Sequence, residues 1–144
     1  MGRLEDIERS QESKQEQLES ETEQSEAKIE DLDNKINELS DAIGSLSEDT
    51  EIQESVQQNL SERQQEQQQE KQKVQELQSQ VEEMSSEIDE YESINENSKS
   101  ELSELQSIGE DVGDAMSTIS QRESWINERR NRISDIQNRL SKIG

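Results

Sequence analysis

The sequence contains no cysteine, histidine, proline or phenylalanine, and its only aromatic residues are Tyr91 and Trp125. Without cysteine there is no disulfide, no thiolate chemistry and no zinc–thiolate site, and nothing indicates the redox state of the compartment. Without histidine the chain lacks the commonest transition-metal ligand and the usual general base. Aromatic side chains usually dominate the burial of a globular core. These absences argue against an enzyme and against a conventional globular domain.

Long apolar runs are missing as well. No stretch approaches the roughly 20 apolar residues that span a bilayer, so we do not expect membrane insertion. The first residues, MGRLEDIERS, contain no apolar segment of the kind found in a classical signal peptide. We therefore expect a cytoplasmic protein, with secretion by a route that needs no signal peptide left open.

Hydrophobic residues make up 24% of the chain, charged residues make up 36%, and the net charge is -22. Low hydrophobicity together with high net charge is the signature of intrinsic disorder. The presence of only five glycines and the lack of proline are unusual for a disordered linker, however. Composition therefore leaves two alternatives, disorder and a thin helical seam, and the order of the apolar residues decides between them.

The apolar residues of the first third of the chain follow a heptad repeat, with Ile at position a and Leu at position d. Carried backwards, the same frame places Leu4 and Leu18 at d, but its other core-facing sites upstream are polar. The seam therefore starts weakly and ends strongly. Its strong part consists of Ile29, Leu32, Ile36, Leu39, Ile43 and Leu46, and its polar sites are Glu8, Gln11, Gln15, Thr22 and Ser25.

A second heptad seam follows the stretch SERQQEQQQEKQK, residues 61–73, which contains no apolar residue. Extrapolated backwards, this seam places Arg63, Gln67 and Glu70 at core-facing sites. The stretch is either a polar interruption within one continuous helix, of the kind that fixes oligomer state at some cost in stability, or a solvated spacer. The seam itself consists of Val74, Leu77, Val81, Met84, Ile88 and Tyr91.

The third seam holds one frame to the end of the chain and includes two arginines, Arg122 and Arg129. If these arginines are buried, they need acidic or amide partners. We expect Trp125, beside the seam, to pack at its edge. The apolar members of this seam are Leu105, Ile108, Val112, Ala115, Ile119, Ile126, Ile133, Ile136, Leu140 and Ile143.

The frame slips twice, between Leu46 and Val56 and between Tyr91 and Leu105. Residues that favour helix ends occur at both places, among them Gly44 and Thr50 at the first and Asn95 and Ser98 at the second. We therefore predict helices over about 3–46, 51–94 and 98–143, in one coiled-coil domain covering residues 1–144. The predicted fold is all-α, an antiparallel three-helix bundle. The alternatives are an extended parallel coiled-coil dimer, in which the slips are stutters or stammers, and a two-helix hairpin.

The predicted bundle places residues 121–133 beside residues 61–73. The basic side chains of the third helix then lie next to acidic side chains of the second, namely Arg122, Arg129, Arg130 and Arg132 beside Glu62, Glu66 and Glu70. The polar stretch 8–17 faces Val81, Met84 and Ile88. Gly109 and Gly113 fall inside the third helix, where glycine costs about 1 kcal/mol relative to alanine. A hinge or close helix approach, a tolerated weak point and a further break in the helix all stay open there.

The charge is distributed unevenly. Residues 1–120 hold nine Lys or Arg against 34 Asp or Glu, whereas residues 121–144 hold six against three. A strongly acidic body argues against nucleic-acid binding, which requires positive charge, and the basic segment more readily pairs with acidic helices. The acidity is equally consistent with an adaptation to high salt or with a source of solubility.

The many carboxylates do not form a recognisable metal or catalytic site. Asp31, Asp33 and Asn34 resemble the start of a calcium loop, but the glycine and the terminal glutamate of such a loop are missing. Acid–base catalysis by paired carboxylates needs a pocket that shifts one pKa, and exposed helix faces offer none. We expect no cofactor, no metal, no small-molecule substrate and no enzymatic activity.

Two functions fit this pattern. The first is a structural or scaffolding coiled coil that mediates helix–helix interaction or self-assembly. The second is a helical adaptor or chaperone, because in size and helical layout the chain resembles the small partner proteins encoded beside bacterial secretion substrates, including those of type VII secretion. The W-x-G and Y-x-x-x-D motifs of that system are absent, since Ile126 and Asn127 follow Trp125 and Asn95 stands four residues after Tyr91. The partner expected in either case is a protein helix, from a copy of this chain or from another protein.

Overall fold

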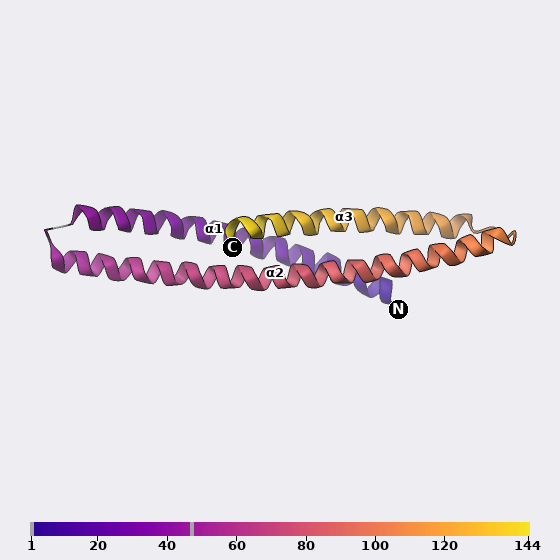
Figure 1. Cartoon of the computed structure of the whole chain (residues 1–144), viewed down its shortest axis with the longest axis horizontal. Helices are drawn as coiled ribbons and strands as arrows, with labels where there is room; N and C mark the ends of the chain where they lie inside the picture. Colours follow the sequence, from indigo (N-terminus) through magenta and orange to yellow (C-terminus); the bar gives the residue numbers. More distant parts are fainter. Residues whose placement is uncertain (1, 47) are drawn as a thin grey trace.

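The computed structural model describes residues 2–46 and 48–144 and shows three α-helices in an elongated bundle (Figure 1). Helix α1 spans Arg3–Ser45, α2 spans Thr50–Ser107 and α3 spans Gly113–Ile143, and the described residues contain no strand. The predicted all-α three-helix bundle is confirmed. The alternative of one extended helix is wrong for this chain, which reverses direction twice.

Side-chain pairs give the relative directions of the helices. Helix α2 runs antiparallel to both of its neighbours, and α1 and α3 therefore run parallel to each other. The pairs that establish these directions are Arg3 with Glu90 and Ser25 with Glu70 between α1 and α2, Lys99 with Glu123 and Arg130 with Asp89 between α2 and α3, and Gln15 with Arg129 and Glu26 with Arg139 between α1 and α3.

The first reversal lies where the sequence predicts it. The backbone N–H of Leu46 donates to the carbonyl oxygens of Ala42 and Ile43, which closes the last turn of α1. Asp49 caps α2, since its side chain accepts a hydrogen bond of 3.2 Å from the backbone N–H of Ile52. An aspartate in this position satisfies one of the free N–H groups at a helix start, so α2 begins at Thr50.

The second reversal does not lie at the predicted residues. Asn95 is only 1% exposed within α2, and its side-chain amide donates to the carbonyl oxygen of Ile119 at 3.4 Å. This packing against α3 outweighs the local turn preference of asparagine, so the predicted helix end at residue 94 and start at residue 98 are corrected. The helix ends instead at Ser107, and Gly109 follows with a φ of 94°, a left-handed conformation typical of a glycine after a helix end.

The later turn changes which residues of α2 and α3 lie side by side. Each residue by which an antiparallel turn moves shifts the pairing of its two helices by two positions. Residues 121–133 therefore do not lie beside residues 61–73, and the predicted pairing with Glu62, Glu66 and Glu70 is wrong. Arg130 instead lies 2.8 Å from Asp89, while Glu70 binds Ser25 of α1.

Because α3 is the shortest helix, the bundle has parts of different thickness (Figure 1). We call the region with three helices the three-helix part; it covers α1 up to Leu32, α2 from Glu70 to Asn95 and α3 from Ile119. We call the region beyond Leu32 and before Glu70 the two-helix end. The main apolar cluster lies in the three-helix part and comprises Ile7, Leu18, Ile29, Val74, Leu77, Val81, Met84, Ile88, Tyr91, Ile126, Ile133, Ile136 and Leu140.

Candidate functional site

A chain of hydrogen bonds crosses the interior of the three-helix part and links all three helices. Arg129 of α3 donates to the side-chain oxygen of Gln15 at 3.0 Å, and Gln15 donates to Gln11 at 2.9 Å. Gln11 in turn donates to the carbonyl oxygen of Met84 on α2 at 3.0 Å and to Glu87 at 3.1 Å. Gln11 and Gln15 are fully buried and Arg129 is 9% exposed. Buried polar groups are tolerated when they bind one another in this way.

An aromatic layer lies next to this polar layer. The rings of Tyr91 and Trp125 lie 4.5 Å apart, and the guanidinium of Arg129 lies 5.6 Å from the Trp125 ring. The Tyr91 hydroxyl donates to Glu8 at 2.6 Å. Burial of the phenol, reinforced by the hydrogen bond and the negative charge of Glu8, raises the pKa of Tyr91 well above its ordinary value. The two aromatic residues of the chain thus connect the three helices at one level.

A third buried polar contact lies at the boundary between the two regions. Glu70 accepts a hydrogen bond of 2.8 Å from the hydroxyl of Ser25, and the Lys28 ammonium lies 3.3 Å from its other oxygen. Glu70 is only 7% exposed, so the lysine offsets part of the cost of burying its charge. These contacts connect α1 and α2 where the third helix ends.

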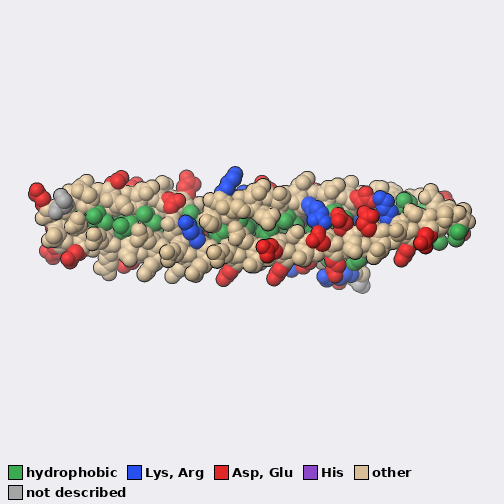
Figure 2. Space-filling model, in the orientation of Figure 1, with side chains coloured by type: hydrophobic (Ala, Val, Ile, Leu, Met, Phe, Trp, Pro, Cys, Tyr) green, Lys and Arg blue, Asp and Glu red, His purple; other side chains and the backbone are tan. Residues whose placement is uncertain are grey.

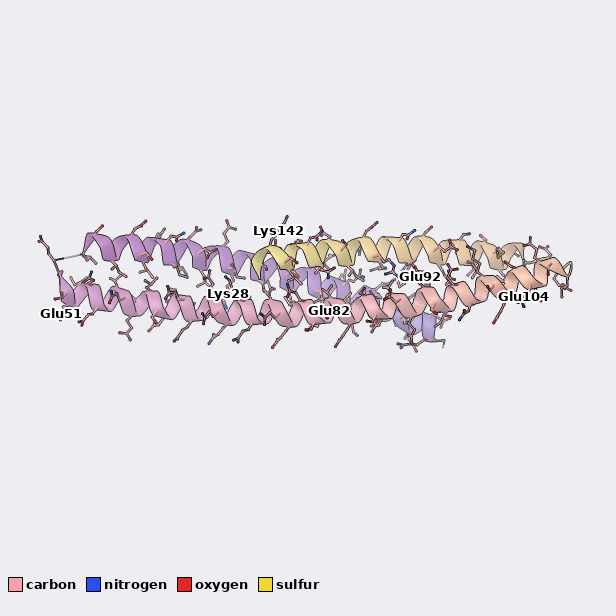
Figure 3. The ribbon with its side chains drawn as sticks, in the orientation of Figure 1. Lys28, Glu51, Glu82, Glu92, Glu104 and Lys142 are labelled. Carbon is pink, nitrogen blue, oxygen red and sulfur yellow. The ribbon has the colours of Figure 1, made fainter. Side chains whose placement is uncertain are left out.

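Basic side chains of α3 bind acidic side chains on both other helices. Arg130 lies 2.8 Å from Asp89 and 3.4 Å from Glu92 of α2, and Arg139 donates to Glu26 of α1 at 3.0 Å. The hydrogen bond with Asp89 raises the pKa of Arg130, and that with Glu26 raises the pKa of Arg139. The acidic residues labelled in Figure 3 are spread along the whole of α2. The basic helix of the chain therefore packs on the acidic pair.

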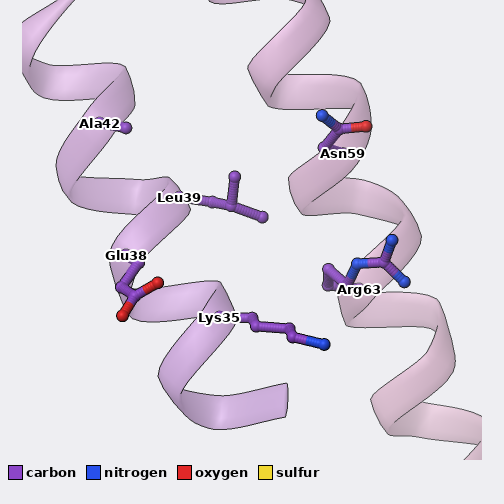
Figure 4. A pocket seen from close by; sticks show the side chains of 6 residues that line it. All are labelled: Lys35, Glu38, Leu39, Ala42, Asn59 and Arg63. Atoms are coloured by element: carbon purple, nitrogen blue, oxygen red, sulfur yellow. The ribbon is translucent and has the colours of Figure 1, made fainter. Parts of the chain in front are cut away.

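The seam of the two-helix end is only partly covered. Hydrophobic side chains remain visible between the helices along the surface (Figure 2). On one side of the pair, a shallow groove of about 430 Å³ is lined by Leu39, Ala42, Asn59 and flanking charged residues, and Leu39 points toward α2 across it (Figure 4). The half-buried apolar residues of the two-helix end are Ile36, Leu39, Ala42, Ile43, Leu46, Val56 and Leu60.

The other side of this pair continues the surface on which α3 packs. Along its length, α3 is bound by Glu12, Gln15, Glu23 and Glu26 of α1 and by Asp89, Glu92, Asn95 and Lys99 of α2. Steps of whole heptads keep a residue on the same face of a bundle. We call the continuation of this surface the amide face. It consists of Asp33, Ile36, Asn37, Ser40 and Ile43 of α1 and of Gln53, Glu54, Gln57, Leu60, Ser61, Gln64, Gln67, Gln68 and Lys71 of α2.

The amide face differs from the rest of the surface in its charge. It holds three apolar residues, eight amide or hydroxyl residues and only three charged residues. These three are two acids and one base, so the face is nearly neutral, whereas the whole chain has a net charge of -22. Two of its glutamines bind across to α1, since Gln67 donates to the Asp33 carboxylate and Gln53 donates to the carbonyl oxygen of Ile43. Most of the polar stretch 61–73 that faces this side is glutamine or serine, and Glu62, Arg63, Glu66 and Glu70 belong to other heptad positions.

The structure places the predicted seam residues in three groups. Those of the three-helix part, together with Val112, are buried. Those of the two-helix end are partly buried, as are Arg63, Gln67, Arg122 and Ile143. Three are exposed, and their assignment is corrected: Leu105 is 42% and Ile108 is 76% exposed, because α2 ends beside them, and Ala115 is exposed in the first turn of α3. The buried group contains Ile29, Leu32, Glu70, Val74, Leu77, Val81, Met84, Ile88, Ile119, Ile126, Arg129, Ile133, Ile136 and Leu140.

Some core residues do not follow from the heptad frame. The frame assigns Glu8 to a core-facing site, but the neighbouring Ile7 is the buried residue, with 1% exposure, while Glu8 is half-buried and binds Tyr91. An apolar side chain beside a charged one was the available signal. Asn95 is also buried. It lies one heptad after Ile88, so extending the second seam through a continuous helix places it in the core.

The described residues contain no cluster of three or more acidic, histidine or cysteine side chains able to hold a metal ion. Within residues 2–46 and 48–144, no helix is sufficiently long and apolar to cross a membrane. The sequence matches no protein-family model, no curated protein and no solved structure.

Proposed function

We propose that this protein is a non-enzymatic structural or scaffolding protein that works through helix–helix interaction, and that the two-helix end is the part that binds. One observation carries the proposal. The most regular apolar seam of the chain, with Ile at a and Leu at d, extends into the two-helix end, where Ile36, Leu39 and Ile43 are only half-buried. A helix placed against them would pack on the pair as α3 packs on it further along.

The polar residues of the three-helix part support a structural role for that region. Gln11, Gln15 and Arg129 bind one another and the backbone of Met84, and Tyr91 binds Glu8. Apart from the Nε of Arg129, which has no hydrogen-bond partner among the described residues, these groups are engaged in contacts inside the bundle. The three-helix part therefore serves as the folded body, and the open seam lies at its end.

An adaptor for another protein is the second candidate, and the stretch 61–73 favours it. Before Glu70 this stretch lies in the two-helix end, where it packs against α1 through contacts such as that of Gln67 with Asp33. Its exposed residues there are Ser61, Glu62, Gln64, Gln65, Gln68 and Gln69. The stretch 8–17, by contrast, is covered within the chain, since Gln11 and Gln15 are fully buried. Of the two polar stretches, only 61–73 would therefore need a partner helix to cover it.

Site-specific photocrosslinking tests the proposal. A photoreactive amino acid would replace Leu60, which is half-buried on the amide face, and in a control it would replace Gln58, which is exposed on a different side of α2. In the cells that make the protein, we expect crosslinks to a protein helix, of this chain or of another protein, from position 60 and not from position 58. Equal or absent crosslinking at both positions would contradict a binding role for the two-helix end.

A further inference from the structure

We propose that two copies of this chain pair through their amide faces, with the two-helix ends overlapping antiparallel about a two-fold axis. The pairing would turn two helix pairs into a four-helix bundle and leave the two three-helix parts pointing in opposite directions. This inference rests on the proposed function and names the partner of the same surface.

The charge of the amide face is the first argument. In a two-fold interface the same patch of surface meets itself: each contact of residue i with residue j occurs twice, and a charge near the axis meets its own copy. The amide face carries only Asp33, Glu54 and Lys71, on a chain with a net charge of -22. Its polar residues are mostly glutamine, and an amide has both donors and an acceptor. Such a side chain can bind a copy of itself, which a carboxylate or an ammonium cannot do.

The positions of the charges are the second argument. Glu54 lies near the tip of the two-helix end and Lys71 near its junction with the three-helix part. In an antiparallel overlap, Glu54 of each copy approaches Lys71 of the other, so the two opposite charges are matched twice. A parallel overlap would instead place each of them beside its own copy. The two acidic bodies also lie far apart in the antiparallel arrangement, which limits their mutual repulsion.

The apolar residues are the third argument. Ile36, Ile43 and Leu60 lie on the amide face and are half-buried in one chain. The same heptad positions further along each helix hold Ile29, Val74 and Val81, which are at most 5% exposed. The surface that α3 covers there continues without a break into the amide face. A second copy would bury these three residues as α3 buries their equivalents.

Sedimentation of the purified full-length chain over a range of concentrations tests the proposal. We expect a reversible monomer–dimer equilibrium that salt strengthens, because salt screens the net repulsion of two acidic chains. Gln64 lies close to the midpoint between Glu54 and Lys71, and hence near the two-fold axis. We expect Gln64→Glu to weaken the dimer at least tenfold, whereas Gln58→Glu, which adds the same charge to a different face, leaves it unchanged.

A mixing experiment sharpens the test. Gln64→Lys should also weaken the dimer, but an equimolar mixture of the Gln64→Glu and Gln64→Lys chains should pair more tightly than either variant alone. Circular dichroism checks that both variants keep the helical content of the parent chain. Equal dimer strength for Gln64→Glu and Gln58→Glu would overturn the proposal, since the dimer would then use another surface.

A chain that stays monomeric at submillimolar concentration would also overturn it. In that case, a crosslink from position 60 to a different protein would leave the proposed helix-binding function in place and remove only the second copy as its partner. Failure of both the crosslink and the dimer would remove the two proposals together. The two measurements therefore separate the choice of partner from the existence of a binding surface.

Discussion

The three-helix part and the two-helix end are built from the same two helices, yet the better apolar seam lies in the less buried region. In the two-helix end, Ile36, Leu39 and Ile43 follow the ideal heptad pattern and stay half-exposed. In the three-helix part, the equivalent sites of α1 include Gln15, Thr22 and Ser25, and all three are fully buried. Burial in this molecule is therefore decided by where α3 lies, and the hydrophobicity of the seam does not predict it.

The largest expected effect compares one isoleucine in each region. Ile88 is fully buried in the three-helix part, whereas Ile43 is half-buried in the two-helix end. We expect Ile88→Ala to lower the free energy of unfolding by about 3 kcal/mol and Ile43→Ala by about 1 kcal/mol or less, because only the first leaves a closed cavity. Urea unfolding of dilute protein, followed by circular dichroism, measures both. Equal losses would mean that the two regions are buried alike.

The next effect concerns the polar layer that only the three-helix part has. Arg129→Leu leaves the buried oxygen of Gln15 without its donor, at an expected cost of about 2 kcal/mol in the free energy of unfolding. Arg132→Leu is the matched control, since the Arg132 side chain is 46% exposed and lies 3.9 Å from Glu128 one turn away; we expect a change of less than about 0.5 kcal/mol there.

Replacing Gln11, Gln15 and Arg129 together by leucine should recover the stability that Arg129→Leu loses, because no polar partner is then left unpaired. If the triple variant is less stable than Arg129→Leu alone, the polar layer stabilises the fold by more than the pairing of its own polar groups. Chemical unfolding of the three proteins side by side gives the comparison.

A smaller effect of opposite sign is expected at Thr22. Its hydroxyl is buried and has no hydrogen-bond partner among the described residues, so Thr22→Val should raise the free energy of unfolding by about 1 kcal/mol. Thr118→Val is the control, because Thr118 is exposed and its hydroxyl donates to the carbonyl oxygen of Asp114 at 3.3 Å. Thermal unfolding of both variants would show a gain for the first only, and a loss at Thr22 would contradict the inferred unpaired hydroxyl.

The smallest effect is a dependence of stability on alkaline pH. Because folding raises the pKa of Tyr91 above the unfolded value of about 10, the neutral phenol stabilises the fold fully below that value. The contribution is lost as the pH rises from there through the higher folded pKa. Tyr91 is the only tyrosine, so the near-ultraviolet absorbance of the phenolate reports its titration directly. If the phenolate appears at the same pH in the native protein as in urea, the burial argument is contradicted. The Tyr91→Phe variant is the control, because its stability at alkaline pH reports the other titrating groups alone.

The spacing of the apolar residues predicts the helical class, the number of helices and the first reversal, because heptad periodicity and a frame slip are local properties of the chain. The second reversal could not. Asn95 favours a turn by local preference, and only its burial against Ile119 shows that the helix continues. The true turn contains Gly109, whose positive φ needs a glycine, but glycine alone does not distinguish a turn from a weak point in a helix.

The candidate surface was harder to predict than the fold for the same reason. The amide face exists because α3 begins after Gly109 and pairs with the later part of α2, which leaves Leu60 and Gln64 without a third helix in this chain. A second turn between residues 94 and 98, as the spacing predicts, would place α3 along the stretch 61–73 and cover this surface. Heptad spacing places Gln15 and Arg129 at core-facing positions, and both are buried, but their partners depend on the position of that turn.

The hydrogen-bonded layer of Gln11, Gln15 and Arg129 also removes an ambiguity that every heptad repeat carries. An apolar interface with period seven looks nearly the same after a displacement of one heptad, so α3 could in principle settle at several depths along the other two helices. A displacement by seven residues in one direction would bring Ile136 to the place of Arg129, next to the buried amides, and in the other direction it would bring Arg129 to the apolar site of Ile136. The layer makes one depth distinct in energy from the others, and the position of the open end of the bundle follows from it.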